Sequence, residues 1–171
     1  NVLQYARLER GRPGQRREEV ALASLIERCQ SRLVDRAAQA DMNLEVQMAD
    51  ADRETRVTTD AAAVEQILFN LVDNACKYAC QAADKRLHLV VTSETRRVRI
   101  TVKDQGPGIA AAGRRRLFQP FSKSVHEAAN TAPGVGLGLA LSRRLAADLG
   151  GRLELQSPAE GGAAFVLTLP R

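Results

Sequence analysis

The sequence predicts a two-layer α/β (α+β) sandwich, in which three helices cover one mixed, mainly antiparallel sheet. Three observations predict this fold class. Three long stretches repeat apolar residues with the period of an amphipathic helix, and several short stretches alternate apolar and polar residues as strands do. Glycine and proline separate most of these stretches. With 171 residues, of which 44% are hydrophobic, the chain is long enough to bury one core.

The first elements in the chain are short. Asn1–Arg10 has helical spacing but stops at a turn, so we expect residues 1–11 to be the tail of a longer preceding helix and residues 12–18 to be a linker. Glu19–Leu22 is expected to form a short strand. Ser24 and Glu27 have the spacing of a capping box, which predicts a helix running to about Ala40.

A long central helix is predicted within Asp60–Ala82, after two short strands at Leu44–Met48 and Arg56–Thr59. Asp60 is the expected N-cap. Winding the stretch as a helix places apolar residues on one broad face and a narrow polar stripe, with few acid–base pairs, on the other. The apolar face holds Val64, Leu68, Leu71, Val72, Ala75 and Ala79, and the stripe holds Gln66, Asn70, Asn74, Lys77 and Gln81.

The second half of the chain begins with a predicted antiparallel hairpin and ends with two further strands. The hairpin strands are Arg86–Thr95 and Arg97–Lys103, and the later strands are Leu153–Leu155 and Phe165–Leu169. Between them we expect a short helix at Ala110–Leu117, a mobile loop at Ser122–Pro133, and a helix that opens at Gly134–Leu139 and ends before Gly150 and Gly151.

Composition argues against nucleic acid as a partner. The net charge is +5, and much of the basic excess lies in the first 36 residues and in Arg114–Arg116, but only 4% of the residues are aromatic. No apolar run approaches the roughly 20 residues that span a membrane, and no signal peptide opens the chain. We therefore expect a cytoplasmic location; whether the full-length protein is anchored in the inner membrane stays open.

The three cysteines are expected to be small buried or edge residues. Cys76 and Cys80 lie one helical turn apart, and Cys29 is distant in sequence. An odd number of cysteines without a secretory signal suits a reducing compartment. Neither His88 nor His126 supplies the spacing that a zinc site requires.

The polar stripe has two interpretations. It is either a solvated face or a face turned toward a ligand. Under the second interpretation, the carbonyl oxygen of Asn74 suits Mg²⁺, and the compact charge of Lys77 suits a phosphate. Other phosphate-binding features in the chain would favour this second interpretation.

Two glycine-containing stretches supply such features. Gly134–Gly138 places three glycines at the mouth of a helix, where free N–H groups and the helix dipole attract a phosphate, although glycines also simply make turns. The stretch is neither a Lys-Ser/Thr phosphate loop nor a Rossmann fingerprint. Asp104 ends a strand ahead of Gly106 and Gly108; it either caps a turn or accepts a hydrogen bond from an exocyclic amine such as that of adenine.

In this order, the motifs resemble the catalytic, ATP-binding domain of bacterial sensor histidine kinases, with its Bergerat-type fold. This superfamily also contains DNA gyrase B, the heat-shock 90 chaperones and MutL. The similar stretches are the N box (Gln66–Tyr78), the G1 box (Asp104–Gly108), the F box (Leu117–Phe121) and the G2 box (Gly134–Gly138). The resemblance covers residues 19–171 as one histidine-kinase-like ATPase domain, and residues 1–11 look like the end of the helical dimerisation domain that precedes it.

The resemblance implies a role for each matched residue. Asn74 would ligate Mg²⁺ with Asn70 beside it, Lys77 would contact phosphate, Tyr78 would flank the nucleotide, and Asp104 would bind the adenine amine. Asn70 and Lys77 would be the catalytic pair. The remaining nucleotide-binding set would be Gly106, Gly108, Ile109, Phe121, Lys123, Gly134, Val135, Gly136, Leu137, Gly138 and Leu139, with residues 122–133 as the ATP lid.

Two departures from the superfamily affect the expected activity. Asn70 stands where the gyrase-like ATPases have a glutamate general base, and an amide does not take a proton from water, so hydrolysis should be slow. Ala163 stands where family members often have threonine, which removes one contact near the adenine. Moreover, neither His88 nor His126 lies in the helical context of a phospho-acceptor.

The resemblance therefore implies a domain that binds ATP and Mg²⁺ and donates the γ-phosphate to a histidine on a separate helical dimerisation domain. The implied partners are that domain and a response regulator, in a full-length protein that is a homodimer, whereas this chain by itself would be a monomer. Two alternatives remain: a protein serine kinase of the anti-sigma-factor type, and a nucleotide-binding scaffold without catalysis.

Overall fold

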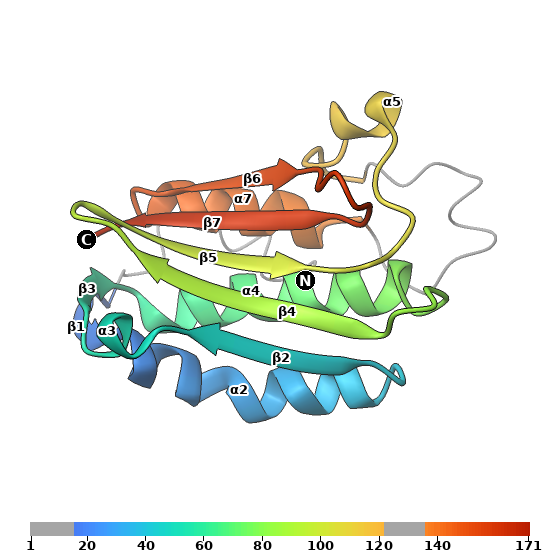
Figure 1. Ribbon diagram of the computed structural model, residues 1–171. Helices are drawn as coiled ribbons and strands as arrows, with labels where there is room; N and C mark the ends of the chain where they lie inside the picture. Colours follow the sequence, from blue (N-terminus) through green and yellow to red (C-terminus); the bar gives the residue numbers. More distant parts are fainter. Residues whose placement is uncertain (1–15, 122–135) are drawn as a thin grey trace.

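A computed structural model describes residues 16–121 and 136–171 of the chain. The main sheet has five strands in the order β2-β4-β5-β7-β6 (Figure 1). Its strands are β2 (Asn43–Met48), β4 (Arg86–Ser93), β5 (Arg97–Lys103), β6 (Arg152–Gln156) and β7 (Ala164–Pro170). β2 and β4 are parallel, and every other neighbouring pair is antiparallel.

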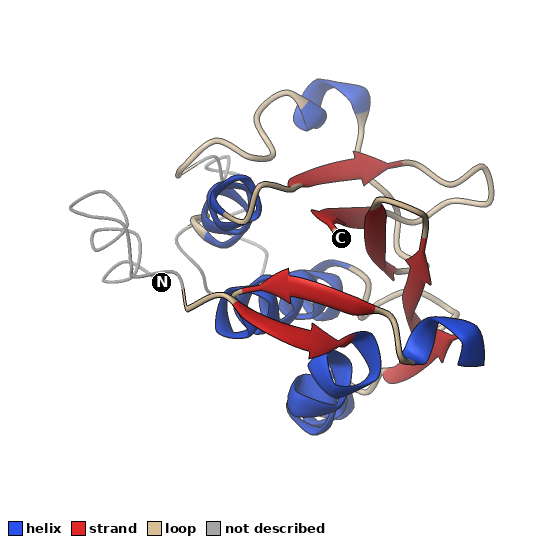
Figure 2. Cartoon of the chain, turned by 90° about the vertical axis from the view of Figure 1, so that its left-hand side faces the viewer, coloured by secondary structure: helices blue, strands red, loops and turns tan. Residues whose placement is uncertain are grey.

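Three helices form the second layer on one face of this sheet: α2 (Leu22–Ala38), α4 (Ala61–Tyr78) and α7 (Gly138–Asp148). Figure 2 shows this helical layer beside the sheet. Alternate strand residues, such as Leu87 and Leu89 of β4, are fully buried, as are Leu68 and Leu71 of α4. The apolar period of the helices and the alternation of the strands therefore meet in one core, and the predicted fold class is confirmed.

Four shorter elements complete the fold. β1 (Glu18–Ala21) and β3 (Arg56–Thr59) pair as a separate antiparallel ribbon. The one-turn helix α3 (Asp50–Arg53) is absent from the sequence prediction, because four residues are too few to display a helical period. The helix predicted at Ala110–Leu117 is also only one turn, α5 (Ala111–Arg114), followed by turns.

The helix ends test the predicted caps. Asp60 caps α4 as predicted, because its Oδ1 accepts a hydrogen bond from Ala63 N at 3.2 Å. The Ser24–Glu27 capping box is wrong: α2 begins earlier, at Leu22, and no side chain caps it. Strand β1 runs directly into α2, and Leu22 N donates to Thr55 O at 2.9 Å, so main-chain contact fixes where this helix begins.

The end of α7 follows the predicted glycine pattern. Gly150 has a φ of +77° and donates to Ala147 O, and Gly151 N donates to Ala146 O at 2.9 Å. A residue with φ in this range is strained unless it is glycine, so Gly150 stops the helix and turns the chain into β6.

The remaining predictions concern isolated residues and segments. Cys29 and Cys76 are buried and Cys80 is half-buried, as expected for small core and edge residues. His88 lies in β4, as predicted. Residues 1–11, most of the 12–18 linker, the 122–133 loop and His126 lie outside the described residues. Among the described helices, none combines the length and the apolar character that crossing a bilayer requires.

Candidate functional site

Helices α4 and α7 meet at the side chain of Asn70, which is only 6% exposed. Its Nδ2 donates to Gly138 O at 3.4 Å and to Ser142 Oγ at 3.1 Å, and its Oδ1 accepts from Gln66 Nε2 at 3.1 Å. The structure thus brings the polar stripe of α4 to the first turn of the glycine-rich helix. Asn70 links the two helices with both of its N–H groups.

Asn74 lies one turn further along the same stripe and has an unsatisfied polar atom. Its Nδ2 is buried and has no hydrogen-bond partner within residues 16–121 and 136–171. A buried amide group without a partner is costly. A half-turn of the amide exchanges nitrogen and oxygen, so this position offers a carbonyl oxygen, a ligand type that Mg²⁺ prefers. The residue therefore fits the expected metal.

Lys77 contacts a carboxylate. Its Nζ lies 2.5 Å from Asp73 Oδ2, and Asp73 Oδ1 accepts from Arg36 Nε at 2.8 Å. The sequence-based description of the stripe as nearly free of ion pairs was therefore wrong for Lys77. Burial raises the pKa of Asp73, but hydrogen bonds from Lys77 and Arg36 outweigh this effect and hold the pKa below its ordinary value.

Asp104 follows β5 and is 7% exposed. Its Oδ1 accepts hydrogen bonds from Gly106 N at 2.9 Å and Ala163 N at 3.2 Å. Burial raises the pKa of the carboxyl group, and the two N–H groups lower it to a smaller extent. Because both hydrogen bonds use Oδ1, the other oxygen is left to accept a hydrogen bond from a ligand.

Tight glycine contacts hold the turn after Asp104 against its neighbours. A Cβ on Gly106 would lie 2.9 Å from the Cβ of Ala79, the residue that ends α4. Gly162, with a φ of +79°, lies so close to the main chain of Asp104 that an added Cβ would overlap its carbonyl oxygen. The end of α4, the Asp104 turn and the start of β7 therefore form one packed unit.

The structure also describes several other predicted site residues. Gly108 and Gly136 have φ values of +73° and +72°, so both turns require glycine. Leu137 is buried and Leu139 is half-buried at the start of α7, and Ile109 is half-buried, with its carbonyl oxygen accepting from Arg114 Nε. Tyr78 is 43% and Phe121 63% exposed. Lys123, Gly134 and Val135 lie outside the described residues.

The two phenylalanines of the F box have different environments. The rings of Phe118 and Phe165 pack in a T-shaped arrangement with centroids 6.4 Å apart, and the guanidinium carbon of Arg143 lies 5.0 Å from the ring centre of Phe118. Phe121 has a φ of +58° and is largely exposed. Phe118 therefore anchors the segment to β7, whereas Phe121 leaves its ring available for a contact outside the core.

Sequence reasoning missed two residues of this site. Ser142 is fully buried and bonded to Asn70; its signal was a hydroxyl four residues after Gly138, on the same face of the helix. Asp73 precedes Lys77 by four residues, which is the spacing of a helical ion pair. Its second partner, Arg36, comes from α2, and no pattern within α4 indicates it.

Comparison with known proteins is consistent with this geometry. Residues 59–171 match the family described as histidine kinase-, DNA gyrase B-, and HSP90-like ATPases. The sensor protein KdpD of Escherichia coli (strain K12) is 30% identical over 171 residues, which is 100% of this chain but 18% of KdpD. The chain therefore spans less than a fifth of the length of that relative.

Two solved structures share the fold. A mycobacterial sensor histidine kinase, MprB, superimposes with a TM-score of 0.72 at 27% identity, covering 90% of this chain and 97% of that one. Full-length ShkA, solved in complex with AMPPNP, superimposes with a TM-score of 0.79 at 28% identity, covering 99% of this chain and 34% of that one.

Proposed function

Because the chain belongs to the family of histidine kinase-, DNA gyrase B-, and HSP90-like ATPases, we propose that it binds ATP with Mg²⁺ and donates the γ-phosphate to a histidine on a separate helical domain. One observation supports this proposal most strongly. Along α4, Asn70 contacts the first residue of α7, Gly138, and Ala79 contacts the turn that follows Asp104. These two contacts are about 13 Å apart along the helix axis, enough to separate a base from a triphosphate.

The base would lie at Asp104. The carboxylate oxygen that makes no hydrogen bond to Gly106 or Ala163 would accept one from the exocyclic amine of adenine. Gly106 and Gly108 would shape the pocket, since a side chain at either position would fill it or strain the turn. Asp104 would thus select a nucleobase that carries a hydrogen-bond donor.

The phosphates would lie at the other end of α4. Free N–H groups at the start of α7, from Gly136 to Gly138, and the positive end of the helix dipole would attract them. Asn74 would hold Mg²⁺ through its amide oxygen, and the ion supplies charge neutralisation when bound. Lys77 would add a positive charge once it leaves Asp73. The reaction then depends on positioning and electrostatic stabilisation.

The partners follow from the reaction. The phosphate acceptor would be a helical dimerisation domain of the same sensor kinase, and the phosphate would pass on to a response regulator. Asn70 has no basic group, and both of its N–H groups already bind Gly138 and Ser142. Water would therefore be activated poorly, and transfer to a histidine would dominate over hydrolysis.

The test is phosphate transfer from radiolabelled ATP to a supplied helical domain that carries a phospho-acceptor histidine. We expect Mg²⁺-dependent, acid-labile labelling of that domain by the wild-type chain, and at least about a tenfold loss with Asp104→Asn or Asn74→Ala. Asp84→Asn is the matched control, because Asp84 is a surface carboxylate that pairs with Arg86. Acid-stable labelling would identify a serine kinase instead, and ATP binding without any labelling would identify a scaffold.

A further inference from the structure

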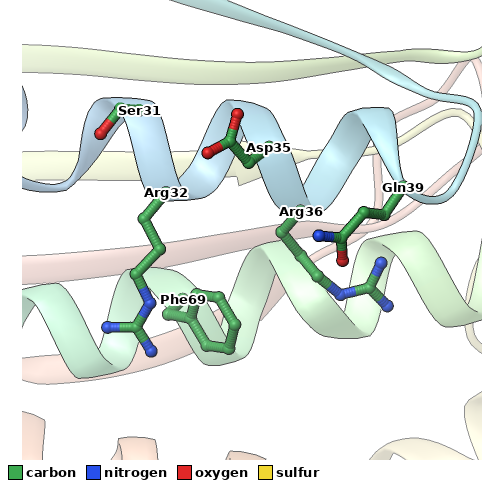
Figure 3. A pocket seen from close by; sticks show the side chains of 6 residues that line it. All are labelled: Ser31, Arg32, Asp35, Arg36, Gln39 and Phe69. Atoms are coloured by element: carbon green, nitrogen blue, oxygen red, sulfur yellow. The ribbon is translucent and has the colours of Figure 1, made fainter.

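Three arginines of α2 face α4 at intervals of one helical turn. Arg28 Nε pairs with Glu65 Oε1 at 3.0 Å, the guanidinium of Arg32 lies 4.0 Å from the ring centre of Phe69, and Arg36 pairs with Asp73. Figure 3 shows Arg32 and Arg36 extending from α2 toward α4, with Arg32 against the Phe69 ring. The partners on α4 are also one turn apart, so the two helices form a ladder of contacts.

The last contact of the ladder differs from the first because Asp73 is shared. One carboxylate oxygen binds Arg36, and the other binds Lys77. Glu65, at the other end, has no lysine among its contacts in the described part of the chain. Lys77 is the residue proposed to contact phosphate, yet in the structure its ammonium group lies with Asp73 at the α2–α4 contact.

We propose that Asp73 is a positioning residue that holds Lys77 away from the nucleotide, so that ATP phosphates must compete with Asp73 for the Lys77 ammonium. Arg36 moderates this competition because it shares the carboxylate and lowers its attraction for Lys77. The inference rests on the proposed function, since it assigns a regulator to the same nucleotide site. It makes α2 a part of the molecule that sets nucleotide affinity.

The exposure of the three charged side chains indicates that Asp73 has a modest effect on ATP binding. The side chains of Arg36, Asp73 and Lys77 are 21%, 23% and 21% exposed. An open cavity of about 360 Å³ is lined by Arg32 and Arg36 among others, so the arginine side of the contact borders solvent. Partly hydrated pairs of this kind are worth up to about 1 kcal/mol, so their loss changes a binding constant by about two- to fivefold.

The two substitutions should act in opposite directions on the Kd of ATP with Mg²⁺, measured by calorimetry. Asp73→Asn releases Lys77, so ATP should bind about two- to fivefold more tightly. Arg36→Gln leaves Lys77 as the sole cation on Asp73, so ATP should bind more weakly. Adenosine, which has no phosphate, should show neither change.

Repeating both substitutions in a Lys77→Met variant separates the positioning of Lys77 from general effects of charge or folding. In Lys77→Met, both changes should disappear, because there is no ammonium group left to hold or release. Glu65→Gln is the matched control: it removes the same charge from α4 and breaks a pair with an arginine of α2, and it should leave the Kd unchanged. Thermal unfolding of each variant checks that the domain stays folded.

The outcomes distinguish the two proposals. No binding of ATP by the wild type would overturn the proposed function and this inference with it. Normal wild-type binding with an unchanged Kd in Asp73→Asn would overturn only the inference, as would a change that persists in Lys77→Met or that Glu65→Gln reproduces. Opposite shifts for Asp73→Asn and Arg36→Gln, both lost without Lys77, would support it.

Discussion

Asp104 is a residue whose proposed role in nucleotide binding should reduce the stability of the fold. Burial raises the pKa of its carboxyl group above the ordinary value of 3.8. The folded state therefore binds a proton more readily than the unfolded state, and ionisation of Asp104 costs stability as pH rises. Groups with this behaviour are frequent at binding sites, where function and stability compete.

Asp104→Asn should therefore stabilise the domain at neutral pH while it removes nucleotide binding. The asparagine keeps Oδ1 for the N–H groups of Gly106 and Ala163 and avoids the buried charge. We expect a gain of roughly 1 kcal/mol at pH 7, measured by urea unfolding. This gain in the free energy of unfolding should begin above pH 3.8 and be complete once the pH exceeds the raised pKa of Asp104.

Asp84→Asn is the control, because the pKa of Asp84 is shifted in the opposite direction from that of Asp104. Hydrogen bonds from Arg86 lower the pKa of Asp84 to about 2, so its ionisation favours the folded state above pH 3.8. Its replacement should bring no gain at neutral pH. An Asp104→Asn variant whose stability relative to wild type does not change with pH would contradict the assigned cause.

Single residues also mark the limit of sequence-based prediction. Asp104 was recognisable because it directly follows an alternating strand and precedes two glycines. The environment of Lys77 was recognisable only in part. Asp73 lies four residues before it on α4, but the second partner of Asp73, Arg36, comes from α2, which a helical wheel of α4 cannot include. Local pattern predicts which residue types are present, whereas the charges around a side chain come from segments distant in sequence.

At the scale of the elements, the side-chain amide of Asn70 forms hydrogen bonds that link α4 to α7. Asn70 donates to the carbonyl oxygen of Gly138 and to the buried hydroxyl of Ser142. A carboxylate of the same size cannot donate to a carbonyl oxygen and would be repelled by it. Helix packing is therefore a reason for asparagine at this position that is separate from its proposed catalytic role.

Asn70→Asp should lower the free energy of unfolding by about 1–3 kcal/mol, because it leaves buried polar groups unpaired. Urea unfolding at pH 7 measures the loss. Asn43→Asp, at an exposed position of β2, is the matched control and should have little effect. Equal stability of the Asn70→Asp variant and the wild type would show that the link between the helices contributes nothing.

The secondary-structure elements were predictable to different degrees. The bounds of β5 follow from its alternation, and the start of α4 follows from Asp60. The start of α2 was missed because a main-chain hydrogen bond to Thr55, rather than a side-chain cap, fixes it. The parallel pairing of β2 with β4 was also out of reach, since alternation reveals a strand but not its neighbour.

At the scale of the whole molecule, the family model and the related sensor histidine kinases confirm the predicted class of enzyme domain. The prediction succeeded because the N, G1, F and G2 boxes follow one another along this chain in the same order as in the family. That order is a consequence of the shared fold topology. Asn70, Asp104 and Gly138 are distant in sequence, yet the sheet order places the turn after β5 beside the end of α4 and places α7 beside α4.

This arrangement predicts that nucleotide stabilises the entire domain. The proposed ligand would contact α4, the Asp104 turn and α7. Because these segments share one core, binding to the folded state should raise the temperature of the single unfolding transition. With ATP and Mg²⁺ at 100 times the Kd, the gain is about 2.7 kcal/mol, which corresponds to a rise in Tm of roughly 5–10 °C. Asp104→Asn should abolish this rise. Two separate transitions with nucleotide present, only one of them shifted, would mean that the segments do not bind it as one unit.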